Sequence, residues 1–129
     1  MAAGRWTVAE ACQRIAEGHA SPWTAVGDFL DAFYRAAQAE RAALIADPPP
    51  RTRDPDALRW QAFAAAMVEW LAHRYGLERP AWTARPEYVL REPWFLYPEG
   101  ALRLWSLFST PPPFKVRNIF CGDRALDRV

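Results

Sequence analysis

Histidine and cysteine, the residues most often used as metal ligands and nucleophiles, are few in this sequence of 129 residues, and they lie far apart. Two histidines, His19 and His73, and two cysteines, Cys12 and Cys121, equal a structural zinc site in ligand number. Neither pair has the separation of about two to four residues with which one turn of chain presents two zinc ligands. The sequence therefore predicts no metal site and no bound cofactor.

Cys121 is the best candidate for a nucleophile. It precedes Gly122 and Asp123, so a helix beginning there would lower the pKa of its thiol. A catalytic cysteine also needs a base, and His19 or His73 could reach it only through the fold. A free cysteine is more often a small buried apolar residue, and we expect that role here.

Carboxylates and glycines add no stronger signal for catalysis. Asp28 with Asp31, and Glu87 with Glu92, are pairs of a kind common on solvated surfaces. The six glycines are scattered and mostly suited to ending helices, so no glycine-rich loop is present to bind phosphate. We therefore predict no catalytic residues, while an enzyme of unknown class stays open as an alternative.

Capped amphipathic segments predict the elements that position these side chains. Thr7, Ser21 and Asp54 are good N-cap residues, and prolines at the next positions suit the first turns of two of the helices. Apolar residues then recur at spacings of three and four. The predicted helices are residues 8–17, 22–45 with a kink near Ala39, 55–75 and 99–109.

The C-terminal half has a different pattern of residues. Proline and aromatic residues alternate irregularly over residues 81–98, which predicts an ordered wrap around the helices. In the helix 99–109, Leu102, Trp105 and Phe108 are expected to face inward. Residues 114–121 could be extended, and Asp123 could cap a short last helix through Leu126. The fold class is therefore all-α: one helical domain over residues 1–129, a compact bundle of about four main helices with an irregular wrap.

Within the helix 55–75, apolar residues cover nearly the whole circumference. Such a helix is expected to lie at the centre of a domain. Trp70 falls on one of its apolar stripes, and we predict that this side chain is buried.

Composition narrows the class of partner. The apolar fraction is 51%, and 16 basic against 15 acidic residues leave a net charge of +1. A folded domain is expected, without the basic excess typical of proteins that bind nucleic acid or anionic membranes. No apolar run approaches the ~20 residues of a membrane helix, and no secretory signal is recognisable. We predict a soluble, cytoplasmic protein with reduced cysteines.

A DNA-binding regulator is the alternative from another class. Helices 8–17 and 22–45 with the intervening turn resemble a helix-turn-helix in outline. A recognition helix reads bases with Arg, Lys, Asn or Gln near its start. Residues 22–28 (PWTAVGD) contain none of these. The sequence thus argues against nucleic acid as the partner.

Four stretches resemble a family of small bacterial proteins, common in high-GC genomes, that end in a Pro-Phe-basic-basic-Arg-Asn-Ile-Phe segment. These stretches are residues 7–11, 28–34, 92–95 and 110–120. Val116 departs from the basic residue expected in the segment, and Cys121 departs from an aliphatic one. Members are often encoded beside a nucleotidyltransferase of the toxin kind, so the resemblance implies an antitoxin-like protein or operon partner, without catalytic residues.

The predicted function is therefore a non-enzymatic protein-binding module, with a cognate toxin as the suggested partner. The partner-binding site is assigned to the C-terminal aromatic and basic segment, because phenylalanine and arginine are favoured in interface cores. Three prolines before it give the segment a fixed direction. The assigned residues are Phe114, Lys115, Arg117, Asn118, Ile119 and Phe120. The alternative, that these side chains anchor the C-terminus to the protein's own core, stays open.

Overall fold

Helices account for most of the chain, 59% of residues against 3% in strands, in a computed structural model that describes residues 6–128. The all-α prediction therefore holds in its coarse form. The N-terminal helices are α2 (Val8–Ala16), α3 (Pro22–Arg35), α4 (Gln38–Ala46) and α5 (Pro55–Arg74). They are followed by η1 (Ala81–Ala84), η2 (Pro86–Tyr88), β1 (Trp94–Phe95), α6 (Gly100–Ser109), α7 (Pro112–Lys115) and β2 (Ile119–Phe120).

The starts of three helices are where the capping residues predict them. The hydroxyl of Thr7 accepts a hydrogen bond from the Glu10 amide at 3.2 Å. Ser21 accepts one from the Thr24 amide at 3.2 Å, and the Asp54 carboxylate accepts one from the Ala57 amide at 3.0 Å. Each bond satisfies one of the amide donors that the first turn of a helix leaves unpaired.

The helix predicted over residues 22–45 with a kink near Ala39 is interrupted slightly earlier, and by a complete break rather than a kink. Ala36 and Ala37 both adopt extended backbone, so α3 ends at Arg35 and α4 begins at Gln38. Arg41 stabilises the break, because its guanidinium donates to the carbonyls of Phe33 at 3.0 Å and Tyr34 at 3.1 Å. These carbonyls lie in the last turn of α3, where the only backbone donor to them among the described residues is the Ala36 amide, 3.3 Å from the Phe33 carbonyl. The guanidinium therefore replaces bonds that a continuous helix would have made.

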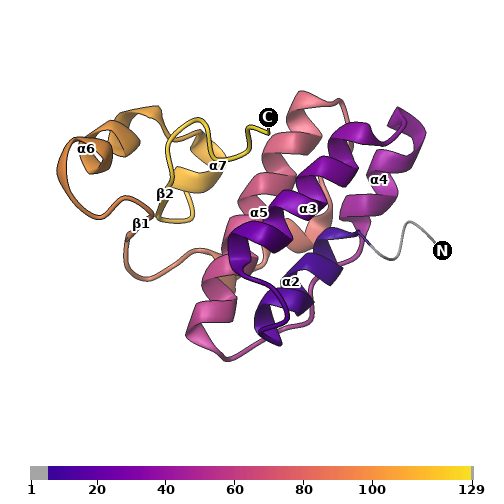
Figure 1. Ribbon diagram of the computed structural model, residues 1–129, viewed down its shortest axis with the longest axis horizontal. Coiled ribbons are helices and arrows are strands. Elements are labelled where there is room, and N and C mark those ends of the chain that lie inside the picture. Colours follow the sequence, from indigo (N-terminus) through magenta and orange to yellow (C-terminus); the bar gives the residue numbers. More distant parts are fainter. Residues whose placement is uncertain (1–5, 129) are drawn as a thin grey trace.

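Helix α5 forms the centre of the packing, as its sequence predicts. Phe63, Met67 and Leu71 are at most 1% exposed, and α2, η1, η2 and α7 all contact this helix. Figure 1 shows α2, α3, α4 and α5 gathered together, with α6, α7 and the two strands beyond them. The C-terminal part of the chain thus reaches the core through α7 and β2.

Residues 81–98 form a wrap that is fixed by aromatic side chains. Trp82 donates its indole N–H to the Ile45 carbonyl at 3.0 Å, and the Tyr88 hydroxyl donates to Gln61 at 3.1 Å. Both rings are buried. The wrap then enters a parallel pair in which Trp94 is opposite Ile119 and Phe95 is opposite Phe120. Of the residues 114–121 predicted as extended, only 119 and 120 form a strand, because α7 and a turn occupy the beginning.

Two C-terminal expectations are wrong. In α6, Phe108 is 79% exposed and Leu102 is 54% exposed, whereas Ser106 is fully buried. Of the three residues expected to face inward, only Trp105 does, since its indole ring packs on Gly122. The buried residues beside it are Ser106 and Thr110, whose hydroxyls donate to backbone carbonyls. The short helix expected between Asp123 and Leu126 is a single turn, with the Asp127 amide donating to the Arg124 carbonyl.

Candidate functional site

The segment assigned to partner binding contributes both to the core and to the surface. Phe114, Arg117 and Ile119 are at most 5% exposed. Lys115, Asn118 and Phe120 are partly exposed, and Val116 between them is 64% exposed. Phe114, Arg117 and Ile119 therefore hold the segment in place and are inaccessible to a partner in this conformation. The outward side of the segment is formed around Val116.

Arg117 joins three parts of the fold. Its guanidinium donates to the Glu69 carboxylate at 2.8 Å, to the Thr83 carbonyl at 2.9 Å and to the Pro113 carbonyl at 2.7 Å. Glu69 lies on α5, Thr83 on η1 and Pro113 on α7. A buried guanidinium needs such a complete set of acceptors, because desolvation of an unpaired cation is costly. Arg117 thus fixes the position of α7 against α5.

Asn118 and Phe120 also have structural partners. Asn118 has a φ of +66° and donates its side-chain amide to the Leu90 carbonyl at 2.9 Å. Asparagine is among the few residues that tolerate this left-handed conformation. Phe120 stacks on Phe95 with ring centroids 4.7 Å apart. These two side chains therefore fasten β2 to the preceding wrap.

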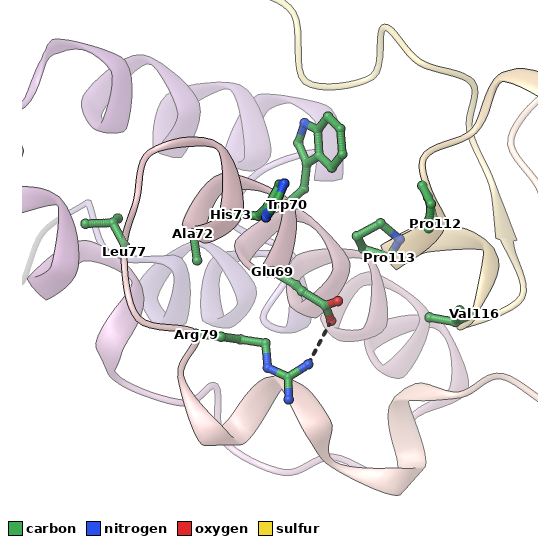
Figure 2. Close-up of a pocket in the computed structure, with 9 residues that line it drawn as sticks. All are labelled: Glu69, Trp70, Ala72, His73, Leu77, Arg79, Pro112, Pro113 and Val116. Carbon is green, nitrogen blue, oxygen red and sulfur yellow. Dashed lines mark ion pairs between the residues drawn. The ribbon is translucent and has the colours of Figure 1, made fainter.

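An open groove lies beside this segment, between the C-terminal half of α5 and α7. Its volume is about 520 Å³. Figure 2 shows Pro112, Pro113 and Val116 on one side of it and the α5 residues on the other. The lining is mainly apolar and consists of Glu69, Trp70, Ala72, His73, Leu77, Arg79, Pro112, Pro113 and Val116. Because α7 begins with two prolines and Arg117 fixes its end, this wall is pre-formed.

The charged side chains of the groove are already paired. Glu69 Oε1 lies 2.8 Å from Arg117 and 3.6 Å from Arg79, whose side chain is 55% exposed. The Glu69 carboxylate is therefore already engaged by two guanidinium groups in this conformation. Arg79 remains at the rim, where it could meet an acidic or carbonyl group of a bound chain.

Trp70 was expected in the core, and this prediction is wrong. Its side chain is only partly buried and lines the groove, with its ring centroid 6.4 Å from that of His73. The inward positions of α5 are filled instead by residues such as Phe63 and Met67. Sequence reasoning also missed the groove itself. The available signal was a stiff Pro111–Pro113 run together with an aromatic residue near the end of a long helix.

The two cysteines are free thiols inside the protein. Burial raises the pKa of the Cys12 thiol and the pKa of the Cys121 thiol to about 12. In the part of the chain that the structure describes, no helix begins after Cys121. The helix N-terminus that was expected to lower the pKa of the Cys121 thiol is therefore not formed. The expectation of small buried residues is met, with Cys12 4% and Cys121 2% exposed. Thiols of this kind are poor nucleophiles at neutral pH.

We expect neither cysteine to react with iodoacetamide in the folded protein at pH 8. Because a thiol with a pKa near 12 is almost wholly protonated, alkylation should be at least about a hundredfold slower than in the unfolded chain. Mass spectrometry of samples quenched over time, with and without urea, measures both rates. Rapid labelling of Cys121 without urea would show that this thiol is accessible and activated.

The remaining site hypotheses receive little support from the geometry. Within residues 6–128, no three side chains of His, Cys, Asp or Glu are placed to share a metal ion. None of the helices described has the length and apolar character needed to cross a membrane. On α3, the exposed start presents Trp23 and Thr24, and Asp28 further along pairs with Arg14 at 3.1 Å. This surface lacks the side chains with which a recognition helix reads bases.

Comparison with known proteins returned no relatives: no protein-family model, no curated protein and no solved structure matches the chain. The functional argument therefore depends on the groove and on the residues that shape it.

Proposed function

We propose that this protein is a non-enzymatic protein-binding module whose partner occupies the groove between α5 and α7. The observation that carries the proposal is the groove itself, which is open, mainly apolar and about 520 Å³ in volume. Binding sites are typically concave and apolar, with a small number of fixed polar groups. Here Glu69 and Arg79 supply those groups.

The chemistry of the lining suits a polypeptide partner. Trp70 offers a large, half-buried aromatic surface, and Val116 and Leu77 offer aliphatic contacts beside it. Interface hot spots are enriched in tryptophan and arginine and lie in pockets from which the partner excludes water. Arg79, exposed at the rim, is placed to fix the orientation of the bound chain.

In this proposal the segment 114–120 acts in two ways. Phe114, Arg117 and Ile119 hold the wall of the groove in position from within. Val116, with Lys115 next to it, faces outward toward the partner. A wall that is already rigid loses little conformational entropy when a partner binds, and this favours affinity.

The nature of the partner is suggested by the sequence resemblance. In the family that residues 110–120 resemble, members are expected to be encoded beside nucleotidyltransferases of the toxin kind. We therefore propose that the partner is such a toxin and that this chain acts as its antitoxin or operon partner. The paired state of Glu69 and the buried thiols support a binding role over catalysis.

The proposal predicts that Val116→Asp impairs binding of the proposed toxin-type partner. A carboxylate at this position would lose its hydration when the partner covers the groove, so affinity should fall at least about tenfold. Isothermal titration calorimetry with the co-expressed, separated proteins measures this change. Unfolding of Val116→Asp in urea should match the wild type, because Val116 is mostly exposed.

Leu104→Asp is the matched control. Leu104 is 58% exposed, similar to Val116 at 64%, but it lies on α6 and does not line the groove. We expect its affinity for the partner to equal that of the wild type. Unchanged binding by Val116→Asp, or equal losses in the two variants, would contradict the assignment of the groove.

A further inference from the structure

Two guanidinium groups meet one carboxylate at the groove between α5 and α7. Among the described residues that line the groove, Glu69 alone carries a carboxylate. Arg117 lies 2.8 Å from its Oε1 atom, and Arg79 lies 3.6 Å from the same atom. The side chain of Arg117 is 6% exposed, whereas that of Arg79 is 55% exposed. One arginine therefore belongs to the interior of the protein and the other to the rim of the groove.

Arg117 is fully engaged by the fold. Besides the bond to Glu69, its guanidinium donates to the Thr83 carbonyl at 2.9 Å and to the Pro113 carbonyl at 2.7 Å. If the side chain turned toward a ligand, these acceptors would lose their donor, and an unpaired buried polar group is costly. The bond between Arg117 and Glu69 is thus part of the folded structure, and it neutralises the carboxylate.

Arg79 is held much more loosely. Its 3.6 Å contact with Glu69 is longer than a hydrogen bond, and ion pairs this exposed contribute little to stability. The planar guanidinium group can bind a carboxylate through two parallel hydrogen bonds. Because Arg117 already neutralises Glu69, Arg79 can exchange this contact for an incoming carboxylate at little cost. The surplus positive charge of the groove is therefore the one that a ligand can reach.

Apolar side chains surround this charge. Figure 2 shows the Arg79 guanidinium directed at Glu69, with Trp70 on the far side of that carboxylate. Val116 and Leu77 also line the groove, whereas the exposed Glu78, next to Arg79 in the sequence, does not. A polyanion such as a nucleic acid is bound by many cations. Apolar walls with one exposed arginine suit a chain in which an acidic side chain stands beside apolar ones.

We propose that the partner segment held in the groove is acidic as well as apolar, and that one of its carboxylates pairs with Arg79. This inference rests on the proposed function of the groove and specifies the chemistry of its occupant. The apolar side chains of the segment contact Trp70 and Val116, and its carboxylate replaces Glu69 as the partner of Arg79. A segment with a lysine or arginine at this position meets a like charge and is disfavoured, so Arg79 contributes specificity.

Two matched fluorescent dyes test the charge preference directly. Anilinonaphthalene sulfonate carries a sulfonate that stands in for the carboxylate, and phenylnaphthylamine is the same aromatic body without a charge. Fluorescence titration of the full-length protein with each dye at low salt gives two dissociation constants. We expect the anionic dye to bind roughly threefold to tenfold more tightly, as for a charge-assisted contact that is partly exposed.

Substitutions of arginine assign this preference to one residue. Arg79→Gln should remove the preference and leave the affinity for the neutral dye unchanged. Arg79→Lys should keep part of it, because the positive charge remains without the planar group. Arg74→Gln is the matched control, since Arg74 is an exposed arginine at the end of α5 that does not line the groove. We expect this variant to bind both dyes as the wild type does.

The neutral dye also shows where binding occurs. Val116→Asp should weaken its binding at least roughly threefold, because a carboxylate in the groove loses hydration under the dye. Leu104→Asp, on α6, should leave it unchanged. Equal affinities of the wild type for the two dyes, or a preference that survives Arg79→Gln, would overturn the acidic partner and leave the groove as a binding site. Neutral-dye binding that is unaffected by Val116→Asp would instead contradict the groove itself, and both proposals with it.

Discussion

We expect Arg117→Ala to lower the free energy of unfolding by about 3 kcal/mol. The Arg117 side chain is 6% exposed and serves three acceptors, on α5, η1 and α7. Breaking a buried ion pair typically costs about 3–5 kcal/mol. The lower end applies here, because Glu69 is partly exposed and keeps its contact with Arg79. Equilibrium urea unfolding followed by tryptophan fluorescence measures the change.

Arg79→Ala provides a matched control, since Arg79 contacts the same Glu69 oxygen at 3.6 Å. Its side chain is 55% exposed, so removal should cost at most about 1 kcal/mol. Equal stability of the Arg117→Ala variant and the wild type would show that the guanidinium is not part of the folded core. In that case Arg117 would again be available to a partner.

The second large effect is expected for Phe114→Ala, at about 3–5 kcal/mol of unfolding free energy. Phe114 is 1% exposed, and its ring centroid lies 5.2 Å from that of Phe63 on α5. Truncation removes this contact and leaves a cavity where α7 meets α5. Urea unfolding of the variant and of the wild type gives the difference.

Val116→Ala is the control within the same segment, two residues further on. Because Val116 is 64% exposed, its truncation should change stability by no more than about 0.5 kcal/mol. A small effect at Phe114 or a large one at Val116 would mean that the segment packs with the opposite side inward.

The helix starts could be predicted from the sequence because their signals are local. Thr7, Ser21 and Asp54 bond to amides three residues further along the chain, so the pattern alone identifies them. The central position of α5 was predictable for a related reason. A helix apolar around its circumference has few stable places other than the middle of a fold.

The break between α3 and α4 was predicted only approximately, as a kink near Ala39. The sequence around Ala36 and Ala37 is compatible with a helix, and no proline or glycine marks the boundary. The break is stabilised by Arg41, whose guanidinium replaces the helical partners of Phe33 and Tyr34. These hydrogen bonds depend on the direction that α4 takes after the break. The spacing of apolar residues in the sequence gives no information on that direction.

The same limit applies to the candidate site. The spacing of apolar residues identifies the buried face of a helix only where a core lies beside it. In α6 the buried residues are Ser106 and Thr110 instead, and Thr110 accepts a hydrogen bond from the Gly122 amide. In the segment 114–120, the residue types suggested an interface. Arg117 is buried instead, because Glu69 and the Thr83 carbonyl accept its hydrogen bonds. The groove joins α5 to α7, which are distant in sequence, and was therefore visible only in the fold.

Covalent footprinting with hydroxyl radicals, of the free protein and of its mixture with the proposed toxin-type partner, tests the proposed binding role most directly. Trp70 and Val116 line the groove and should be protected when the toxin-type partner is bound. Trp23, 48% exposed on α3, should be labelled equally in both states. Protection of Trp23 with unchanged labelling of Trp70 and Val116 would contradict the groove as the partner-binding site.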